Sequence, residues 1–299
     1  MRRRAEALVG AVPPLLVAAE RVAATVAQGV HGRRRVGTGE SFWQFRRYQP
    51  GDAIQRIDWR QTAKSQTVYI RELEWEAAQS VWLWRDASPS MAYRSARNLP
   101  TKQERAELLL LAVACLLSRA GERVALLGGE SAPATGRALV GNIVDALEHG
   151  AGAGGPAAGL PGNQHIPRHA ELVLIGDFLS PLDEVNRVVA GYANRGVRGH
   201  LLQVLDPAEA TLPFDGRIRF TGLEGEPDML IPRVETIREA YLDRLSVQQD
   251  GLSALCRSAG WSWAVHRTDR PPQAALLGIY AALSRDPLDQ PVAAADEEH

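Results

Sequence analysis

Three oxygen-bearing side chains stand close together in the stretch VWLWRDASPSM, residues 81–91. Asp86 directly follows a short apolar and aromatic run, and Ser88 and Ser90 follow it at intervals of two residues. A carboxylate with two hydroxyls can hold a cation, support a nucleophilic reaction, or cap the helix that comes next. The local pattern leaves these three alternatives open.

A second acid, Asp177, ends another apolar run, ELVLIGD at 171–177. In open α/β sheets, ligands bind beyond the carboxyl ends of the strands, near the point where the strand order reverses, so both acids can reach that edge. Together with Ser88 and Ser90 they offer only oxygen ligands, which suit a hard cation such as Mg²⁺ or another divalent ion. The competing interpretation is that the serines cap the next helix while Asp86 pairs with an arginine.

Apolar runs that alternate with helical patterns predict the fold that carries these acids. The runs typical of buried strands are 81–84, 123–128, 171–178, 199–206 and 261–266. The helical patterns between and after them are 101–119, 134–150, 182–194, 234–259 and 273–284, the first opened by the capping-box sequence TKQE. This order favours an α/β fold with a doubly wound, mostly parallel, Rossmann-like sheet. Residues 216–222 alternate as an edge strand would.

The first 78 residues differ in character from this pattern. From Pro14 onward one helical face is apolar, with Leu15, Ala19, Val22, Ala23 and Val26. We interpret it as an amphipathic helix that packs on its own protein or a partner, not as an export signal or a membrane span. Glycines and alternation over 31–79 indicate hairpins and strands. The expected organisation is a helix and β-rich segment at 1–78, the sheet domain at 79–285, and a disordered acidic tail at 286–299.

Composition excludes several classes of protein. The 299 residues carry a formal net charge of −1, with 45% hydrophobic and 23% charged residues, which is ordinary for a globular protein and gives no general attraction to nucleic acid or acidic membranes. The two cysteines, Cys115 and Cys256, lie in apolar helical segments and are expected to be buried thiols in a reducing compartment. A cytoplasmic location is therefore expected, with membrane contact only indirect.

The D-A-S-P-S stretch at 86–90 resembles the metal-ion-dependent adhesion site of von Willebrand factor A domains, which has D-x-S-x-S after the first strand. In that family the further ligands are a threonine in a later loop and an aspartate at the end of a further strand. The resemblance assigns the aspartate to Asp177. The candidate threonine is Thr135 in ATGRAL, whose neighbours match the family less closely.

Residues 46–64, RRYQPGDAIQRIDWRQTAK, closely resemble the signature of a bacterial family known as domain of unknown function 58. The resemblance runs from about Gly37 to beyond Asp177 and joins such a segment to a von Willebrand A-like domain. It implies an adaptor that works with a MoxR-type AAA+ ATPase in chaperone-like maturation or assembly of an unknown client protein. Within the signature, interleaved arginines, acids and aromatic residues favour a structural ion-pair network over a partner surface or a nucleic-acid site.

Other chemistry-bearing residues have structural interpretations. The tryptophans at 43, 59, 75, 82 and 84 are expected to pack in the core between the β-rich segment and the sheet. His165 and His169 flank Pro167 and are expected to be exposed, not zinc ligands.

The function expected from the sequence is non-enzymatic protein binding, through a Mg²⁺-dependent site of Asp86, Ser88, Ser90 and Asp177. In that mechanism an acidic side chain of a partner completes the coordination of the ion. The alternative is a metal-dependent hydrolase or phosphotransferase that uses Asp86 or Ser88. Against this alternative, the sequence contains no G-x-S-x-G elbow, no D-x-D pair and no phosphate-binding loop.

Overall fold

The computed structural model describes residues 14–29, 42–47, 59–62, 64, 68–73, 80–129, 132–148 and 159–284. The chain forms two compact units, one of residues 1–33 with 80–299 and the other of residues 34–79. In the smaller unit, β1 (Phe42–Arg47) pairs antiparallel with β2 (Tyr69–Leu73), and a short helix, α3, covers Trp59–Thr62. The strands expected in this segment are therefore present, whereas the short helix α3 was not expected.

The larger unit is built on a five-stranded sheet whose order is β4-β3-β5-β6-β9, with every neighbouring pair parallel. The strands are β3 (Ser80–Arg85), β4 (Arg123–Leu126), β5 (Glu171–Gly176), β6 (Arg198–Leu205) and β9 (Ser262–Arg267). β3 and β5 are buried along their whole length, as expected for strands covered on both faces.

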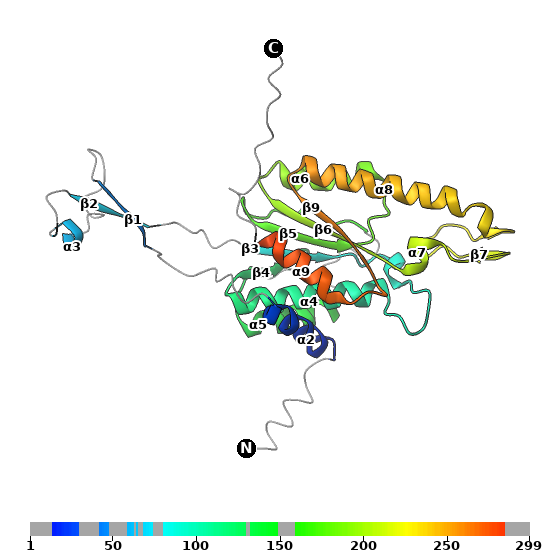
Figure 1. The fold of residues 1–299 in the computed structure, drawn as a ribbon, viewed down its shortest axis with the longest axis horizontal. Helices are drawn as coiled ribbons and strands as arrows, with labels where there is room; N and C mark the ends of the chain where they lie inside the picture. Colours follow the sequence, from blue (N-terminus) through cyan, green and yellow to red (C-terminus); the bar gives the residue numbers. More distant parts are fainter. Residues whose placement is uncertain are drawn as a thin grey trace, which may run out of the picture. The chain divides into compact units, whose positions relative to one another are not determined.

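Helices cover both faces of the sheet, which confirms the doubly wound α/β prediction (Figure 1). Four helices share one apolar core with the sheet: α2 (Pro14–Gly29), α4 (Lys102–Ala120), α5 (Arg137–Glu148) and α9 (Pro272–Leu283). On the other face, α6 (Leu182–Ala193) and α8 (Arg238–Ser258) enclose a second core that contains Trp82 and Trp84.

The N-terminal helix α2 packs on its own chain, against α4 and α9. Its predicted apolar face is correct, because Ala19, Val22, Ala23 and Val26 are all buried. The predicted division at residue 78 placed this helix with the β-rich segment, whereas in the structure it belongs to the sheet domain. The difference follows from its long-range contacts, which a boundary drawn along the chain does not anticipate.

Local signals located several elements well. Thr101 and Glu104 form the predicted capping box of α4, which ends at Gly121 in the left-handed conformation. Cys115 and Cys256 are free and buried, as expected. Trp82 and Trp84 are buried, Trp59 is exposed against expectation, and Trp43 and Trp75 lie where side chains are not described.

Two predictions in the C-terminal half need correction. The helix expected over 234–259 is interrupted at Ile237, where a short 3₁₀ turn, η3 (Val234–Thr236), meets α8. The strand expected at 216–222 is β7 (Ile218–Phe220), but it pairs with β8 (Met229–Ile231) in a separate two-stranded hairpin and is not an edge of the main sheet. Within 159–284 this hairpin has no third strand.

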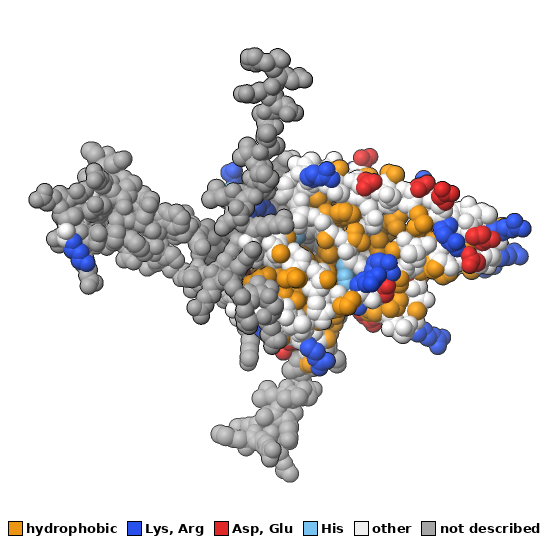
Figure 2. Space-filling view, viewed as in Figure 1, with side chains coloured by type: hydrophobic (Ala, Val, Ile, Leu, Met, Phe, Trp, Pro, Cys, Tyr) orange, Lys and Arg blue, Asp and Glu red, His pale blue; other side chains and the backbone are white. Residues whose placement is uncertain are grey.

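Surface character varies over the sheet domain. Figure 2 shows apolar side chains gathered on the face that carries β9, α8 and α9, and charged side chains at the end that carries β7. Exposed apolar residues of these three elements are Val247 in α8, Val265 in β9 and Leu277 in α9. Within the part of the chain that the structure describes, no helix combines the length and apolar character needed to cross a bilayer.

Two predictions concern residues that the structure does not describe. The ion-pair network expected within residues 46–64 is one, because most of its charged side chains lie outside the described residues. The tail expected at 286–299 is the other.

Candidate functional site

The centre of the sheet has a switch point between β3 and β5. From β3 the chain moves to β4 on one side, and after β4 it crosses back to β5 on the other side. Asp86 follows β3 and Asp177 follows β5, so both acids lie at the edge where such folds bind ligands. The Asp86 N–H continues the sheet by donating to the Ile175 carbonyl at 2.8 Å.

Gly176, the last residue of β5, allows the two loops to approach. A Cβ atom at this position would lie 2.8 Å from the Asp86 Cβ, closer than real Cβ contacts come. The absence of a side chain at Gly176 is therefore a condition for the position of Asp86.

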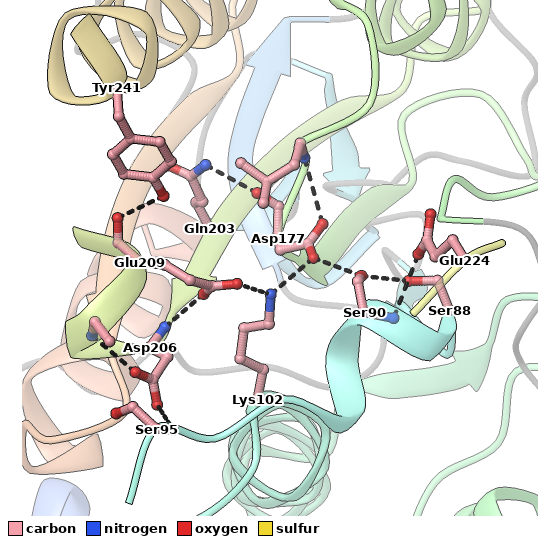
Figure 3. Close-up of polar contacts among 12 residues, drawn as sticks. Ser88, Ser90, Ser95, Lys102, Asp177, Gln203, Asp206, Glu209, Glu224 and Tyr241 are labelled. Carbon is pink, nitrogen blue, oxygen red and sulfur yellow. Dashed lines mark hydrogen bonds and ion pairs between the residues drawn. The ribbon is translucent and has the colours of Figure 1, made fainter. Parts of the chain in front are cut away.

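Asp86, Ser88, Ser90 and Asp177, named here the strand-end cluster, are brought together as predicted. Asp86 Oδ1 accepts from the Ser88 N–H at 2.7 Å. The Ser88 and Ser90 hydroxyl oxygens lie 3.0 Å apart, and Ser90 Oγ donates to Asp177 Oδ2 at 2.7 Å (Figure 3). A continuous chain of hydrogen bonds thus links the loop after β3 to the end of β5.

The second carboxylate oxygen of Asp86 has no partner. Asp86 is fully buried, and its Oδ2 forms no hydrogen bond. Burial, followed by the charge of Asp177, raises the pKa of Asp86 from 3.8 to about 6, although hydrogen bonds from Ser88 and the attraction of Lys102 act in the opposite direction. An orphaned buried carboxylate oxygen is costly, and a cation beside it would remove that cost.

A lysine that the sequence reasoning missed enters the same site. Lys102 Nζ donates to Asp177 Oδ2 at 2.9 Å and to Glu209 Oε1 at 2.6 Å, and its side chain is completely buried (Figure 3). Burial disfavours its charge, but the two carboxylates outweigh burial and hold the pKa of Lys102 above its ordinary value. The lysine therefore offsets the charge of Asp177 and Glu209.

Two sequence signals could have drawn attention to this pair. Lys102 is the first residue of α4, where the helix dipole favours an acid over a cation. Glu209 belongs to a capping box with Asp206 at the start of α7 (Pro207–Thr211), directly after β6. Asp206 is itself a third acid at a strand end, but its carboxylate is engaged by the N–H groups of Ala208 and Ser95.

The predicted threonine ligand is not part of the cluster. Thr135 is exposed and follows Ala134, which pairs with Val124 in β4. Val124 is in register with Val81, five residues before Asp86 and thus roughly 16 Å back along the strand direction at 3.3 Å per residue. The assignment of Thr135 is therefore wrong, because its loop returns along the edge of the sheet away from the strand ends.

Other candidate ligands stay apart as well. His165 and His169 are exposed, as predicted. In the described parts of the chain, no group of three or more His, Cys, Asp or Glu residues could hold a metal ion. The strand-end cluster itself offers two carboxylates and two hydroxyls.

A cavity of about 800 Å³, named here the rim pocket, opens beside the cluster, with Ser88, Ser90 and Asp177 in its lining. This volume is typical of pockets that bind ligands or side chains of a partner. Its apolar lining includes Leu179, Leu212, Phe214, Phe220 and Leu223, and its acids besides Asp177 and Glu209 are Glu184, Glu224 and Glu226. The rim pocket thus combines apolar walls with strongly negative charge.

Another polar network lies at the opposite ends of the strands. His200 Nε2 lies 2.8 Å from Glu171 Oε2, and its Nδ1 lies 2.8 Å from the Ser262 hydroxyl. The order of acid, histidine and serine is that of a hydrolase triad, but Glu171 also pairs with Arg198, and both Glu171 and His200 are buried. We interpret the network as structural: its polar contacts link β5, β6 and β9.

Comparisons with known proteins identify relatives without an assigned activity. The model of a family described as "Protein of unknown function DUF58" matches residues 44–251. The uncharacterized proteins Rv1480 of Mycobacterium tuberculosis and Mb1516 of Mycobacterium bovis are each 26% identical over 264 residues, which cover 84% of this chain and 82% of theirs. A crystal structure of the conserved hypothetical protein BatB from Bacteroides thetaiotaomicron aligns with 69% of this chain and 97% of its own, at 15% identity and a TM-score of 0.30.

Proposed function

The chain belongs to the DUF58 family, and from that premise and the geometry of the strand-end cluster we propose that it is a non-enzymatic, protein-binding adaptor with a divalent-cation site of the von Willebrand A type. Its partners in this proposal are a MoxR-type AAA+ ATPase and a client protein whose maturation or assembly the pair assists. The family resemblance supports the choice of partner, and the site supports the choice of mechanism.

The single observation that carries the proposal is the buried, unpartnered Oδ2 of Asp86. It lies beside the wall of the rim pocket, because a Cβ on the pocket-lining residue Gly159 would lie 3.8 Å from it. The hydroxyls of Ser88 and Ser90 and the carboxylate of Asp177 are the neighbouring oxygen donors. This set fits Mg²⁺, which prefers oxygen ligands and retains water or partner oxygens in its shell. When bound, the ion supplies an open coordination position for a partner's carboxylate.

Lys102 has a specific part in this mechanism. Its ammonium already neutralises much of the charge of Asp177 and Glu209. Fewer protein charges are then left for the cation to balance, so the ion retains more attraction for a carboxylate of the partner. Besides Asp86 and Asp177, the ligands at the cluster are the two serine hydroxyls, which are neutral and act in the same direction.

The rim pocket provides the surface around that ion. Leu179 and Leu223 line it and are each more than 40% exposed, so they can contact apolar side chains beside the partner's acid. We propose a partner segment in which an acidic residue is flanked by apolar residues. Such an interface combines one directional contact with apolar burial.

The enzymatic alternative is less well supported by the geometry. Ser88 Oγ lies 3.0 Å from Ser90 Oγ, and Asp86 Oδ1 accepts from the backbone N–H of Ser88. Among its described contacts, the Ser88 hydroxyl has no histidine within hydrogen-bond reach to act as a general base. Asp86 is also held against the sheet by its own N–H and by the approach of Gly176.

Capture of a MoxR-type ATPase from the same organism tests the proposal. Wild type, Asp86→Ala and the exposed-site control Asp250→Ala are each immobilised and offered the ATPase in Mg²⁺ and in EDTA. We expect the wild type and Asp250→Ala to retain the ATPase only in Mg²⁺, and Asp86→Ala to lose at least about 90% of it, because a charged ligand to the ion is gone. Equal recovery of the ATPase by all three proteins, in Mg²⁺ and in EDTA, contradicts the mechanism. Phosphatase or esterase turnover that is lost in Ser88→Ala would favour the enzyme instead.

A further inference from the structure

A glutamate from a distant hairpin reaches the strand-end cluster. Glu224 Oε1 accepts from the Ser90 N–H at 3.3 Å, across 134 positions of sequence. Figure 3 shows Glu224 directed at the loop that carries Ser88 and Ser90. Glu224 belongs to residues 221–228, named here the Glu224 loop, which connects β7 and β8 and lines the rim pocket with Glu226.

The conformation of the Glu224 loop depends on two glycines. Gly225 has a φ of +97°, which L side chains rarely adopt, and a Cβ at Gly222 would lie 2.3 Å from the Glu226 carbonyl oxygen. The Glu226 carboxylate accepts from the Glu224 N–H at 2.9 Å and closes the turn. These features orient the Glu224 side chain toward the cluster.

Glu224 adds a third carboxylate to the surroundings of the strand-end cluster. Lys102 is engaged with Asp177 and Glu209, while Glu224 forms no ion pair within the described residues. A third carboxylate is thus held on the loop of the strand-end cluster, whose own acids are Asp177 and Asp86 with its orphaned Oδ2, and like charges repel. A divalent ion at the cluster would convert this repulsion into attraction.

The hairpin that carries Glu224 is weakly anchored. Its two strands have three residues each, and a two-stranded hairpin by itself is marginally stable in water. Leu223, Met229 and Leu230 are exposed apolar side chains of the same hairpin. The Glu224 loop can therefore be displaced at low cost, and a partner has apolar side chains to contact as it does so.

We propose that Glu224 is an internal carboxylate ligand of the cation, and that it occupies the position which the partner's acidic side chain takes on binding. This inference rests on the proposed cation-dependent function and adds its regulation: the partner must displace the chain's own carboxylate. The site thereby selects partners whose acid and apolar flanks together outcompete Glu224.

Binding of Mn²⁺ alone tests the inference, because Mn²⁺ substitutes for Mg²⁺ and reports on its bound water through water-proton relaxation. The variants are Glu224→Gln, the control Asp228→Asn, which removes the same charge from the same loop, and Asp86→Ala. We expect Glu224→Gln to weaken Mn²⁺ affinity at least about fivefold more than Asp228→Asn, since it removes a charged ligand. We also expect it to increase the relaxation per bound Mn²⁺, because water replaces the lost carboxylate.

Acetate, added to the Mn²⁺-saturated proteins, stands in for a partner's carboxylate. It should displace bound water from Glu224→Gln at a lower concentration than from the wild type or Asp228→Asn, because the internal competitor is gone. If Glu224→Gln and Asp228→Asn agree in Mn²⁺ affinity, relaxation and acetate response while Asp86→Ala loses Mn²⁺, the role of Glu224 is refuted and the cation site stands. If the wild type binds no Mn²⁺, or Asp86→Ala binds it as tightly as the wild type, the proposed function fails and this inference with it.

Discussion

Asp86 is the residue at which folding and function are in conflict. A fully buried carboxylate with one unpartnered oxygen costs stability, and the pKa raised to about 6 expresses that cost. Because the pKa in the folded state lies above that of the unfolded chain, the folded state binds more protons between about pH 4 and pH 6. In that window the contribution of Asp86 becomes less favourable as the pH rises, and at pH 7 the full penalty is present. Residues that destabilise their own fold in this way are characteristic of functional sites.

Replacing Asp86 by Asn should therefore stabilise the metal-free protein at pH 7. The amide oxygen can still accept from the Ser88 N–H, and the uncompensated charge is removed. We expect a gain of about 1 to 2 kcal/mol in the free energy of unfolding, less than the full pKa shift implies because the new amide N–H group needs its own partner. Urea unfolding in EDTA measures it.

The control for this prediction is Asp250→Asn on the exposed surface of α8, which should change the free energy of unfolding little. Added Mg²⁺ should raise the unfolding temperature of the wild type and of Asp250→Asn more than that of Asp86→Asn, because only the first two retain both charged ligands. Asp86→Asn being less stable than the wild type in EDTA would show that the buried charge is compensated by other groups.

At the scale of elements, the site depends on how closely β3 and β5 end beside each other. Their parallel register carries through Arg85 and Ile175 to the Asp86 N–H, so the two acids are positioned by backbone hydrogen bonds. Helix α4, held at its start by the Thr101 and Glu104 capping box, brings Lys102 to the same place. Each element contributes one charge, and Gly176 permits their approach.

Gly176→Ala should disturb this arrangement. The new Cβ would meet the Asp86 Cβ at 2.8 Å, and the hydrogen bond from the Asp86 N–H to the Ile175 carbonyl keeps the two residues from moving apart easily. We expect a loss of about 1 to 3 kcal/mol of stability, as for overpacking of a core, and weaker Mn²⁺ binding. Gly141→Ala in α5, where a Cβ meets nothing within 4 Å, is the matched control and should be neutral or stabilising. Unchanged stability and Mn²⁺ affinity in Gly176→Ala would mean that Asp86 tolerates displacement.

At the scale of the whole molecule, the sheet domain is completed by a helix that precedes the β-rich segment in sequence. Helix α2 contributes Ala19, Val22, Ala23 and Val26 to the core that contains α4, α5 and α9. Residues 34–79 therefore form an insertion between two parts of one domain. Stability of the sheet domain, and with it the geometry of the strand ends, should depend on α2.

Val22→Asp tests that dependence, since it places a charge in the shared core. We expect a loss of about 2 to 4 kcal/mol, typical of an unpaired buried charge. Val17 lies on the same helix but is 43% exposed, so Val17→Asp should change stability by less than about 0.5 kcal/mol. Urea unfolding followed by tryptophan fluorescence, which reports on the buried Trp82 and Trp84, distinguishes the two variants. Similar small effects of both would place α2 outside the cooperative unit.

Several features of this protein were determined by the sequence alone. Apolar runs that alternate with amphipathic patterns predicted the parallel sheet and its two helical layers, because burial on one or two faces imposes its period on the chain. The capping box at Thr101 and the acids that end β3 and β5 were equally readable, since each depends on neighbours a few residues away. Asp86, Ser88, Ser90 and Asp177 were found together for this reason.

Only the tertiary structure decided which other side chains contact the strand-end cluster. Lys102 contacts Asp177 across 75 positions, and Glu224 contacts Ser90 across 134, and neither pairing leaves a local pattern. Thr135 was placed wrongly because its position along the chain says nothing about which way its loop turns at the edge of the sheet. Local periodicity encodes which face of an element is buried, whereas the charge balance of a site arises from the packing of elements whose order in space differs from their order in sequence.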